Sequence, residues 1–211
     1  MMATLAVANQ RYEEMFLWLG LAFVIDGIDG PLARYVDIKE RLPRFSGERL
    51  DLVIDYLTYV FVPVLAVLNA GLLPSAAAMP IGVGILLSSL YHFSDTASKA
   101  EDNSFVGFPA IWNIVAFYLF VFQPVAWVAA LACTACIGLT FVPFRWVHPM
   151  RVVSRRSITL VALAFWLIAA AAAVAAGFGA VPLWAKLGLV AVAAYALCLP
   201  FLADAKAPRP S

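Results

Sequence analysis

The sequence predicts an all-α, polytopic transmembrane helical bundle. Of its 211 residues, 64% are hydrophobic and only 13% are charged, and the mean hydropathy is +0.91. Soluble domains carry about 45–50% apolar and about 25% charged residues, so this composition excludes a water-soluble globular enzyme. Seven apolar stretches approach the length of about 20 residues that a helix needs to cross a bilayer. The alternating pattern of a membrane β-barrel is absent from them.

Seven predicted spans follow one another along a single integral-membrane domain, residues 1–211. They cover residues 14–34, 50–70, 75–94, 107–122, 124–143, 157–177 and 181–203. Turn-forming residues separate several of them, as at Asn69-Ala70-Gly71 and at Gln123-Pro124. Lipid offers no hydrogen-bond partner, so each backbone N–H and C=O group in a span needs one within the chain, which favours helices.

The basic residues predict the orientation in the membrane. Twelve of the 14 Lys and Arg residues fall in alternate connecting segments, namely 34–49, the segment around Lys99, 145–156 and the C-terminal tail. The turns between them, at 71–74, 123–124 and 177–180, carry none. By the positive-inside rule the basic side faces the cytoplasm, so we expect segment 34–49 to lie there.

Partners and packing are also constrained by composition. The formal net charge of +1 predicts no nucleic-acid partner, while the apolar spans predict contact with membrane lipid.

Cys133 and Cys136 stand alone in an apolar run, which favours packing over redox or metal chemistry. The run of small residues 169–176 predicts close helix contact, either at the seam of a homodimer or inside the bundle.

Four aspartates need an explanation because they lie on apolar, helix-like sequence. Asp26 and Asp29 are in FVIDGIDGPLAR, and Asp51 and Asp55 are in GERLDLVIDYLTYV. An aspartate at mid-bilayer depth costs about 2.5–3.5 kcal/mol on insertion scales, and less near the interface. Four of them on two neighbouring helices would therefore be hard to retain without a compensating cation.

Helical periodicity places these carboxylates on two stripes that can face each other. Each stripe combines two aspartates with residues that have almost no side chain. The stripe on the first helix consists of Asp26, Asp29, Gly30 and Ala33. The stripe on the second, at spacings i, i+4 and i+8, consists of Gly47, Asp51 and Asp55.

Two interpretations of the carboxylates are open from the residues alone. Facing carboxylates raise one another's pKa values, and hard divalent cations with oxygen ligands relieve this. Two such ions about 3.5–4 Å apart suit phosphoryl chemistry, with Arg34 able to donate to phosphate oxygens. Alternatively, the aspartates form interfacial ion pairs with Arg34 and Arg49.

The order and spacing of these residues resemble the motif of the CDP-alcohol phosphotransferases. The matching pattern is Asp26-x-x-Asp29-Gly30-x-x-Ala33-Arg34, followed by Gly47-x-x-x-Asp51-x-x-x-Asp55. Twelve residues separate Arg34 from Gly47, which is longer than is typical of the family. This longer spacing resembles the bacterial branch that condenses CDP-diacylglycerol with free choline.

The resemblance implies an activity and a role for each motif residue. It implies transfer of a phosphatidyl group from CDP-diacylglycerol to choline with release of CMP, at the cytoplasmic face of a bacterial inner membrane. The metal ligands would be Asp26, Asp29, Asp51 and Asp55, with Asp55 also the general base. The nucleotide and diphosphate would lie against Gly30, Ala33, Arg34 and Gly47. Two ions are implied, Mn²⁺ or Mg²⁺, which oxygen ligands alone do not separate.

Choline as the acceptor is also favoured by the residues. An anionic acceptor needs Lys or Arg in its pocket, and the predicted spans contain almost none. A quaternary ammonium group needs aromatic ring faces, each worth about 0.5–2 kcal/mol. Candidates near the cytoplasmic ends of the spans are Tyr56, Tyr91 and Trp112. Interfacial anchoring or packing is the alternative for each ring.

The resemblance also implies a helix before the one that carries the first aspartate pair. Here the chain begins MMATLAVANQRYEEM, so we expect about seven spans and only a remnant of the family's first helix. Three alternatives stay open at this point: the same chemistry with serine or inositol, an ion transporter whose carboxylates relay cations, and a non-catalytic membrane protein.

Overall fold

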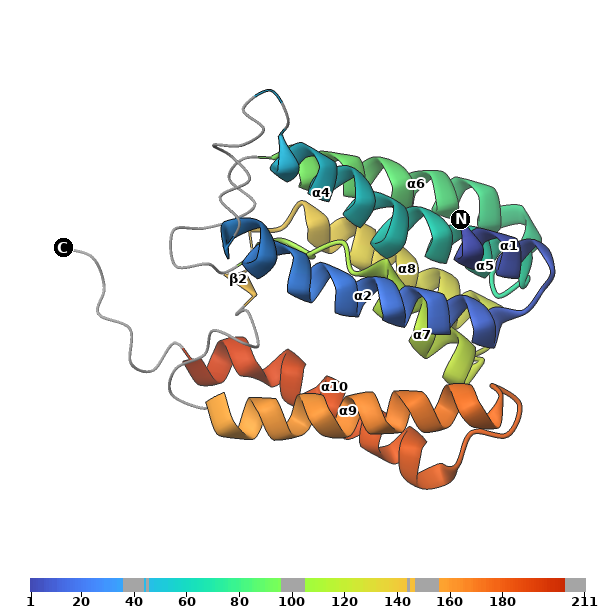
Figure 1. Ribbon diagram of the computed structural model, residues 1–211. Helices are drawn as coiled ribbons and strands as arrows, with labels where there is room; N and C mark the ends of the chain where they lie inside the picture. Colours follow the sequence, from blue (N-terminus) through green and yellow to red (C-terminus); the bar gives the residue numbers. More distant parts are fainter. Residues whose placement is uncertain (36–43, 45, 96–104, 144, 147–155, 204–211) are drawn as a thin grey trace.

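A computed structural model of the chain describes residues 1–35, 44, 46–95, 105–143, 145–146 and 156–203. Within these ranges it is a bundle of helices with one short pair of strands (Figure 1). The helices are α1 (Met2–Ala8), α2 (Tyr12–Tyr35), α4 (Gly47–Asp55), η1 (Tyr56–Phe61), α5 (Val62–Asn69), α6 (Ser75–Ser94), α7 (Trp112–Phe122), α8 (Ala126–Thr140), α9 (Arg156–Ala176) and α10 (Leu183–Ala203). The strands are β1 (Phe105–Val106) and β2 (Arg145–Trp146).

All seven predicted spans coincide with helices, so the all-α helical bundle is confirmed. The second span is one continuous rod, hereafter the 47–69 rod, in which a π-helical turn, η1, joins α4 to α5. The residues before α2 form α1, which packs against α2 and α5. The fourth span begins later than predicted, at Trp112 instead of residue 107.

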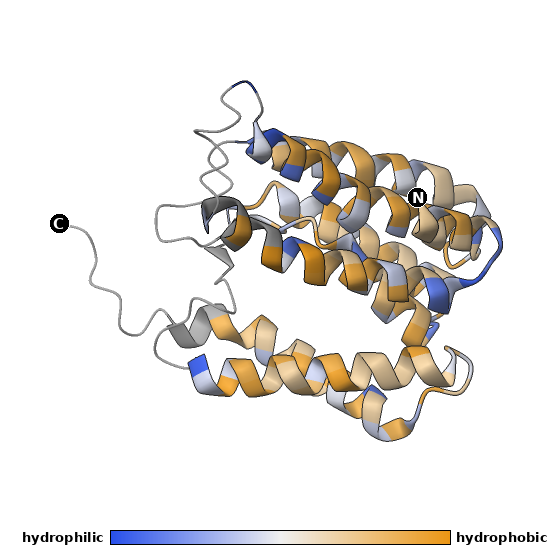
Figure 2. Ribbon diagram, viewed as in Figure 1, coloured by the Kyte–Doolittle hydropathy of each residue, from blue (hydrophilic) through white to orange (hydrophobic). Residues whose placement is uncertain are grey.

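The helices have the length and surface of a membrane bundle. Judged on the described residues, three helices are long and apolar enough to cross a bilayer: the 47–69 rod, α6 and α9. The helices α7, α8 and Leu183–Leu199 are apolar but shorter. Apolar residues occupy most of the length of the helices (Figure 2), and large apolar side chains such as Leu17, Val128 and Ile168 point outward. In water this surface would be unfavourable, whereas in lipid it is the expected exterior.

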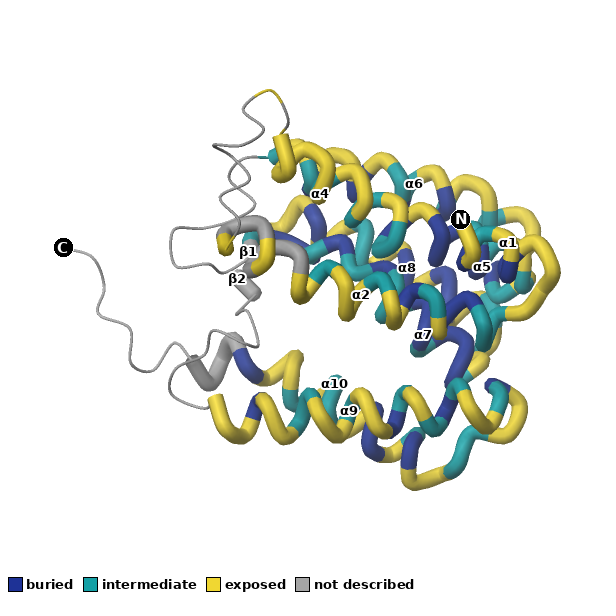
Figure 3. Tube along the Cα trace, in the orientation of Figure 1, coloured by how far each residue is buried: buried dark blue, intermediate teal, exposed yellow. Residues whose placement is uncertain are grey.

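The hydrophobic core is concentrated away from the C-terminal half of α2 (Figure 3). Phe16 makes edge-on ring contacts with Phe117, Phe120 and Phe178, with centroids 5.4–5.5 Å apart. Met15 and Leu19 are buried on the same part of α2, but residues 20–28 are exposed or half-buried. The half of α2 that carries the aspartates is therefore the more open half.

The late start of α7 follows from Gly107, which has a φ of +78°. A Cβ atom at this position would lie 2.4 Å from the backbone oxygen of Thr140, so only glycine fits. Next to it, the Phe108 N–H donates to the Leu139 backbone oxygen at 3.1 Å. Residues 107–108 thus pack on the end of α8 directly after β1, which pairs antiparallel with β2.

The small residues of α9 pack against other helices of the same chain. Ala169 and Ala173 are fully buried, and α9 packs along α10, where Gly188 approaches Phe165 closely. These contacts favour packing inside the bundle as the reason for the run, and a homodimer stays a prediction. Cys133 is likewise buried, with no disulfide, in agreement with the packing interpretation.

Candidate active site

Three of the four predicted carboxylates converge between α2 and the 47–69 rod. Asp26 comes from α2, Asp51 and Asp55 come from α4, and each offers an oxygen atom within 4.8 Å of the other two. Asp51 is exposed, whereas Asp26 and Asp55 are half-buried. We call these three residues the carboxylate cluster. Asp26 is the only member of the α2 stripe whose side chain is described, and it approaches the stripe on α4 as expected; for the other members the facing of the two stripes stays a prediction.

The start of α4 sets the stripe that contributes two of these carboxylates. Ser46 caps the helix, with its Oγ accepting the backbone N–H of Arg49 at 3.3 Å. From this start, Gly47, Asp51 and Asp55 follow one another at intervals of four residues along one face. The Oδ1 atom of Asp55 is buried, so one oxygen of the cluster is shielded from water.

The Asp26 carboxylate also accepts a hydrogen bond from a tyrosine hydroxyl. Tyr59 lies in the π-helical turn η1 and donates to Asp26 Oδ2 at 2.9 Å. The bond ties the 47–69 rod to α2 beside the cluster. The sequence interpretation did not assign this role to Tyr59, although its position four residues after Asp55 could have suggested it.

The described side chains fit a divalent cation. Three carboxylate groups this close repel one another unless positive charge is placed among them. Hard cations such as Mg²⁺ and Mn²⁺ prefer oxygen ligands of this kind. Among the side chains that the structure describes, no ion pair joins Arg49 to the cluster, which weakens the ion-pair interpretation for that arginine.

Other motif residues lie beside the cluster along the two helices. Asp29, Gly30, Ala33 and Arg34 belong to the last turns of α2, and their side chains lie outside the described part. Their predicted roles therefore stay predictions. Gly47 is described, and apart from its chain neighbours and its own helix backbone no described atom lies within 4 Å of the place that a Cβ would occupy, so there is space beside it.

The three candidate choline contacts lie in different surroundings. Tyr56 is half-buried on η1, donates to the Leu86 backbone oxygen at 3.1 Å and meets the Phe93 ring edge-on. Tyr91 is 52% exposed on α6. Trp112 is 2% exposed, and its Nε1–H donates to Ser89 Oγ at 2.9 Å. A role in choline binding stays a prediction for all three.

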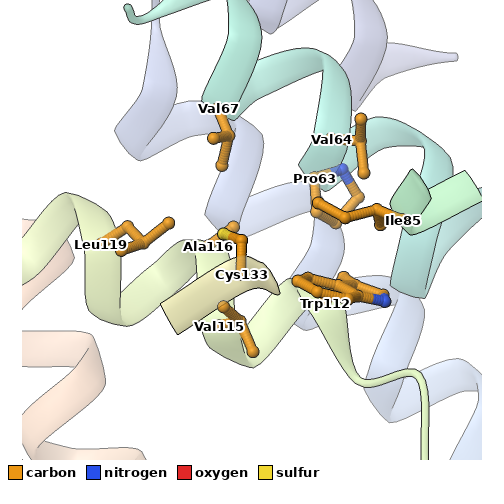
Figure 4. A pocket seen from close by; sticks show the side chains of 9 residues that line it. All are labelled: Pro63, Val64, Val67, Ile85, Trp112, Val115, Ala116, Leu119 and Cys133. Carbon is orange, nitrogen blue, oxygen red and sulfur yellow. The ribbon is translucent and has the colours of Figure 1, made fainter. Parts of the chain in front are cut away.

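A small cavity inside the bundle is separate from the cluster. It measures about 10 Å³, room for about one water molecule, and apolar side chains such as Ile85, Val115 and Leu119 line it (Figure 4). No charged residue lines it. It is a packing gap between α5, α6, α7 and α8, too small for a substrate.

Several known proteins similar to this chain are phosphatidylcholine synthases. The chain is 40% identical to a phosphatidylcholine synthase of Mesorhizobium japonicum over 94% of its own length and 78% of the relative. It is 42% identical to one of Pseudomonas aeruginosa, covering 80% and 71%. The match to one of Bradyrhizobium diazoefficiens is 46% identical and covers 80% of this chain but 63%, less than two thirds, of that protein. No family model and no solved structure matches the chain.

Proposed function

Because the chain belongs to the bacterial phosphatidylcholine synthase family of enzymes, we propose that it transfers the phosphatidyl group of CDP-diacylglycerol to free choline and releases CMP. The observation that carries the proposal is the convergence of Asp26, Asp51 and Asp55 to within 4.8 Å. Separate interfacial ion pairs would not require three carboxylates to be held so close.

The cation site is assigned to the carboxylate cluster together with Asp29, and we propose that it holds two ions, Mn²⁺ or Mg²⁺. When bound, the ions would neutralise the donor's diphosphate and make its phosphorus easier to attack. The exposed position of Asp51 and the half-buried positions of Asp26 and Asp55 support a site that is open on the side where a donor would enter.

Asp55 acts as the general base. Its place in the carboxylate cluster, within 4.8 Å of the oxygens of Asp26 and Asp51, supports this role, because a general base must lie where the acceptor hydroxyl meets the donor. The proton of the choline hydroxyl passes to the Asp55 carboxylate while the choline oxygen forms a bond to the β-phosphorus. The bond from that phosphorus to the bridging oxygen breaks, and CMP leaves with the oxygen and the bonding electron pair.

The donor's diphosphate and nucleotide lie against the small residues of the two stripes. Open space beside Gly47 supports this placement. Gly30 and Ala33 follow Asp26 on the same helix, and Arg34 would donate to phosphate oxygens in a fork geometry. The diacylglycerol chains would stay in the bilayer and reach the site laterally.

The site faces the cytoplasm in a bacterial inner membrane. The end of α2, the start of α4 and the start of α9 lie at one end of the bundle, on the left of Figure 1, and the turn between α9 and α10 lies at the other. The basic connecting segments therefore adjoin the end of the bundle that carries the cluster, which the positive-inside rule assigns to the cytoplasm.

A direct assay tests the function. Purified protein is given CDP-diacylglycerol, MnCl₂ and, in parallel, labelled choline, serine or inositol. We expect phosphatidylcholine and CMP in equal amounts, and no product with Asp55→Asn. A serine or inositol lipid would instead identify another acceptor. Cation flux into vesicles without CMP release would favour a transporter, and neither product nor flux would leave the non-catalytic alternative.

A further inference from the structure

We propose that Tyr59 is a positioning residue, which holds the Asp26 carboxylate in the orientation that cation binding needs. The proposal rests on the proposed function, since it assumes that the carboxylate cluster binds divalent cations. It goes further by assigning a role to a residue outside the motif. Its basis is the hydrogen bond from the Tyr59 hydroxyl to Asp26 Oδ2, 2.9 Å long.

The Tyr59 bond differs from those of the other tyrosines that the structure describes. The hydroxyls of Tyr56 and Tyr118 donate to the backbone oxygens of Leu86 and Leu189, and that of Tyr12 donates to the side-chain amide oxygen of Asn69. The hydroxyl of Tyr195 shares a hydrogen bond with the Thr159 hydroxyl. Those acceptors are neutral, and the bonds fasten one helix to another. Tyr59 donates instead to a carboxylate that shares a cluster with two others.

Tyr59 lies in the π-helical turn η1, which begins directly after Asp55. A π-turn holds more residues than an α-turn, so it changes which side chain the helix presents to its neighbour. Such turns are frequent at functional sites. Here the turn lies where the 47–69 rod leaves the cluster, and it directs a donor back to Asp26.

The chemistry of the bond suits a positioning role. A carboxylate has several acceptor positions, so a donor on Oδ2 fixes the group while leaving other lone pairs for a cation. Hydrogen bonds to metal-binding side chains orient them, and their loss typically weakens metal affinity by about 10- to 100-fold. We therefore expect Tyr59→Phe to keep the ring packing and to weaken cation binding by about 10-fold or more.

Cation binding can be measured without turnover. Purified protein in detergent is titrated with MnCl₂, and the electron paramagnetic resonance signal of free Mn²⁺ gives the dissociation constant. The matched control is Tyr12→Phe, which also removes a tyrosine hydroxyl bond between α2 and the 47–69 rod, but at Asn69. We expect Tyr12→Phe to bind Mn²⁺ as the unmodified chain does.

A double-mutant cycle isolates the contact. In the Asp26→Asn background Tyr59→Phe should cause little further loss of Mn²⁺ affinity, because both changes act through the same carboxylate. In the assay, excess MnCl₂ should restore the turnover of Tyr59→Phe. Equal Mn²⁺ binding by the unmodified chain and Tyr59→Phe would overturn the role of Tyr59, as would equal losses in Tyr59→Phe and Tyr12→Phe. No Mn²⁺ binding by the unmodified chain would instead contradict the proposed function itself.

Discussion

Asp26 and Asp55 belong to different helices, α2 and α4, yet their carboxylate oxygens lie within 4.8 Å of each other and of Asp51. Each carboxylate alone would be a costly residue in a membrane helix. Together the three carboxylates concentrate negative charge beside the less buried, C-terminal half of α2. The relationship between the two residues makes the pair of helices, and not either helix alone, the unit to which we assign cation binding.

The cluster predicts that Asp51 is indispensable although it is exposed. Asp51→Asn removes one charge and one metal ligand, and we expect synthesis of phosphatidylcholine to fall by about 100-fold or more. The control is Glu48→Gln, which removes an exposed acid from the first turn of the same helix outside the cluster. Initial rates at saturating substrates measure both. Similar rates for the two variants would contradict a specific role of Asp51.

Metal should stabilise the folded protein. A ligand that binds only the folded state stabilises it by about 2.7 kcal/mol at a concentration of 100 times its Kd. We expect MnCl₂ to raise the apparent Tm in detergent, and EDTA to reverse the rise. The Asp55→Asn variant should show a smaller rise because it lacks one ligand. An equal increase of the apparent Tm in the unmodified chain and in Asp55→Asn would show that the ion binds away from Asp55.

Gly107 predicts a stability effect far from the cluster. Gly107→Ala combines a positive φ with a Cβ atom 2.4 Å from a backbone oxygen, whereas Gly71→Ala has a positive φ of +65° in open space. We expect a loss of about 1 kcal/mol for Gly71→Ala, and of about 2 kcal/mol or more for Gly107→Ala. Thermal unfolding in detergent compares them. Equal losses would show that Gly107 has room for a side chain.

The choline prediction can be tested at Tyr56. Its hydroxyl bond to Leu86 is lost in both Tyr56→Phe and Tyr56→Leu, but only the second loses the aromatic ring. If the ring contacts the ammonium group, Tyr56→Leu raises the KM for choline about 2- to 30-fold while Tyr56→Phe leaves it nearly unchanged. The KM for CDP-diacylglycerol is the internal control. Unchanged choline KM in Tyr56→Leu would remove Tyr56 from the acceptor site.

The orientation predicts which surface positions react in whole cells. Arg44 and Ser75 are both exposed, and they lie next to opposite ends of the 47–69 rod. The test replaces each of them with cysteine in turn. In a background without the three native cysteines, we expect an impermeant maleimide to label Ser75→Cys in intact cells. Arg44→Cys should be labelled only after the membrane is opened. The reverse pattern would place the cluster on the outer face.

Hydrophobic length was sufficient to predict the spans, and helical period to predict which aspartates share a face on each of the two helices that carry them. That is why the seven spans coincide with helices and why Asp26, Asp51 and Asp55 converge as expected. Both patterns are local in sequence, whereas the meeting of the two faces is a contact between helices, which the cost of isolated carboxylates in a membrane suggested. The positions of Asp29 and Arg34 side chains, outside the described part, are not tested by this agreement.

Features that depend on distant contacts were not predictable in the same way. The late start of α7 depends on Gly107 meeting Thr140, and the strand pair depends on residues 105–106 meeting 145–146. The π-turn after Asp55 leaves no clear mark in a run of apolar residues. The Tyr59 bond to Asp26 joins a residue outside the motif to the neighbouring helix, so a search for spaced carboxylates does not find it.

The most direct test of the cation site is a structure determined with MnCl₂ and CDP, using anomalous scattering at the manganese edge. We predict manganese peaks among the carboxylates of Asp26, Asp51 and Asp55, with the diphosphate beside Gly47. Manganese bound away from all three carboxylates, or carboxylates that turn apart in the presence of the ion, would contradict the account.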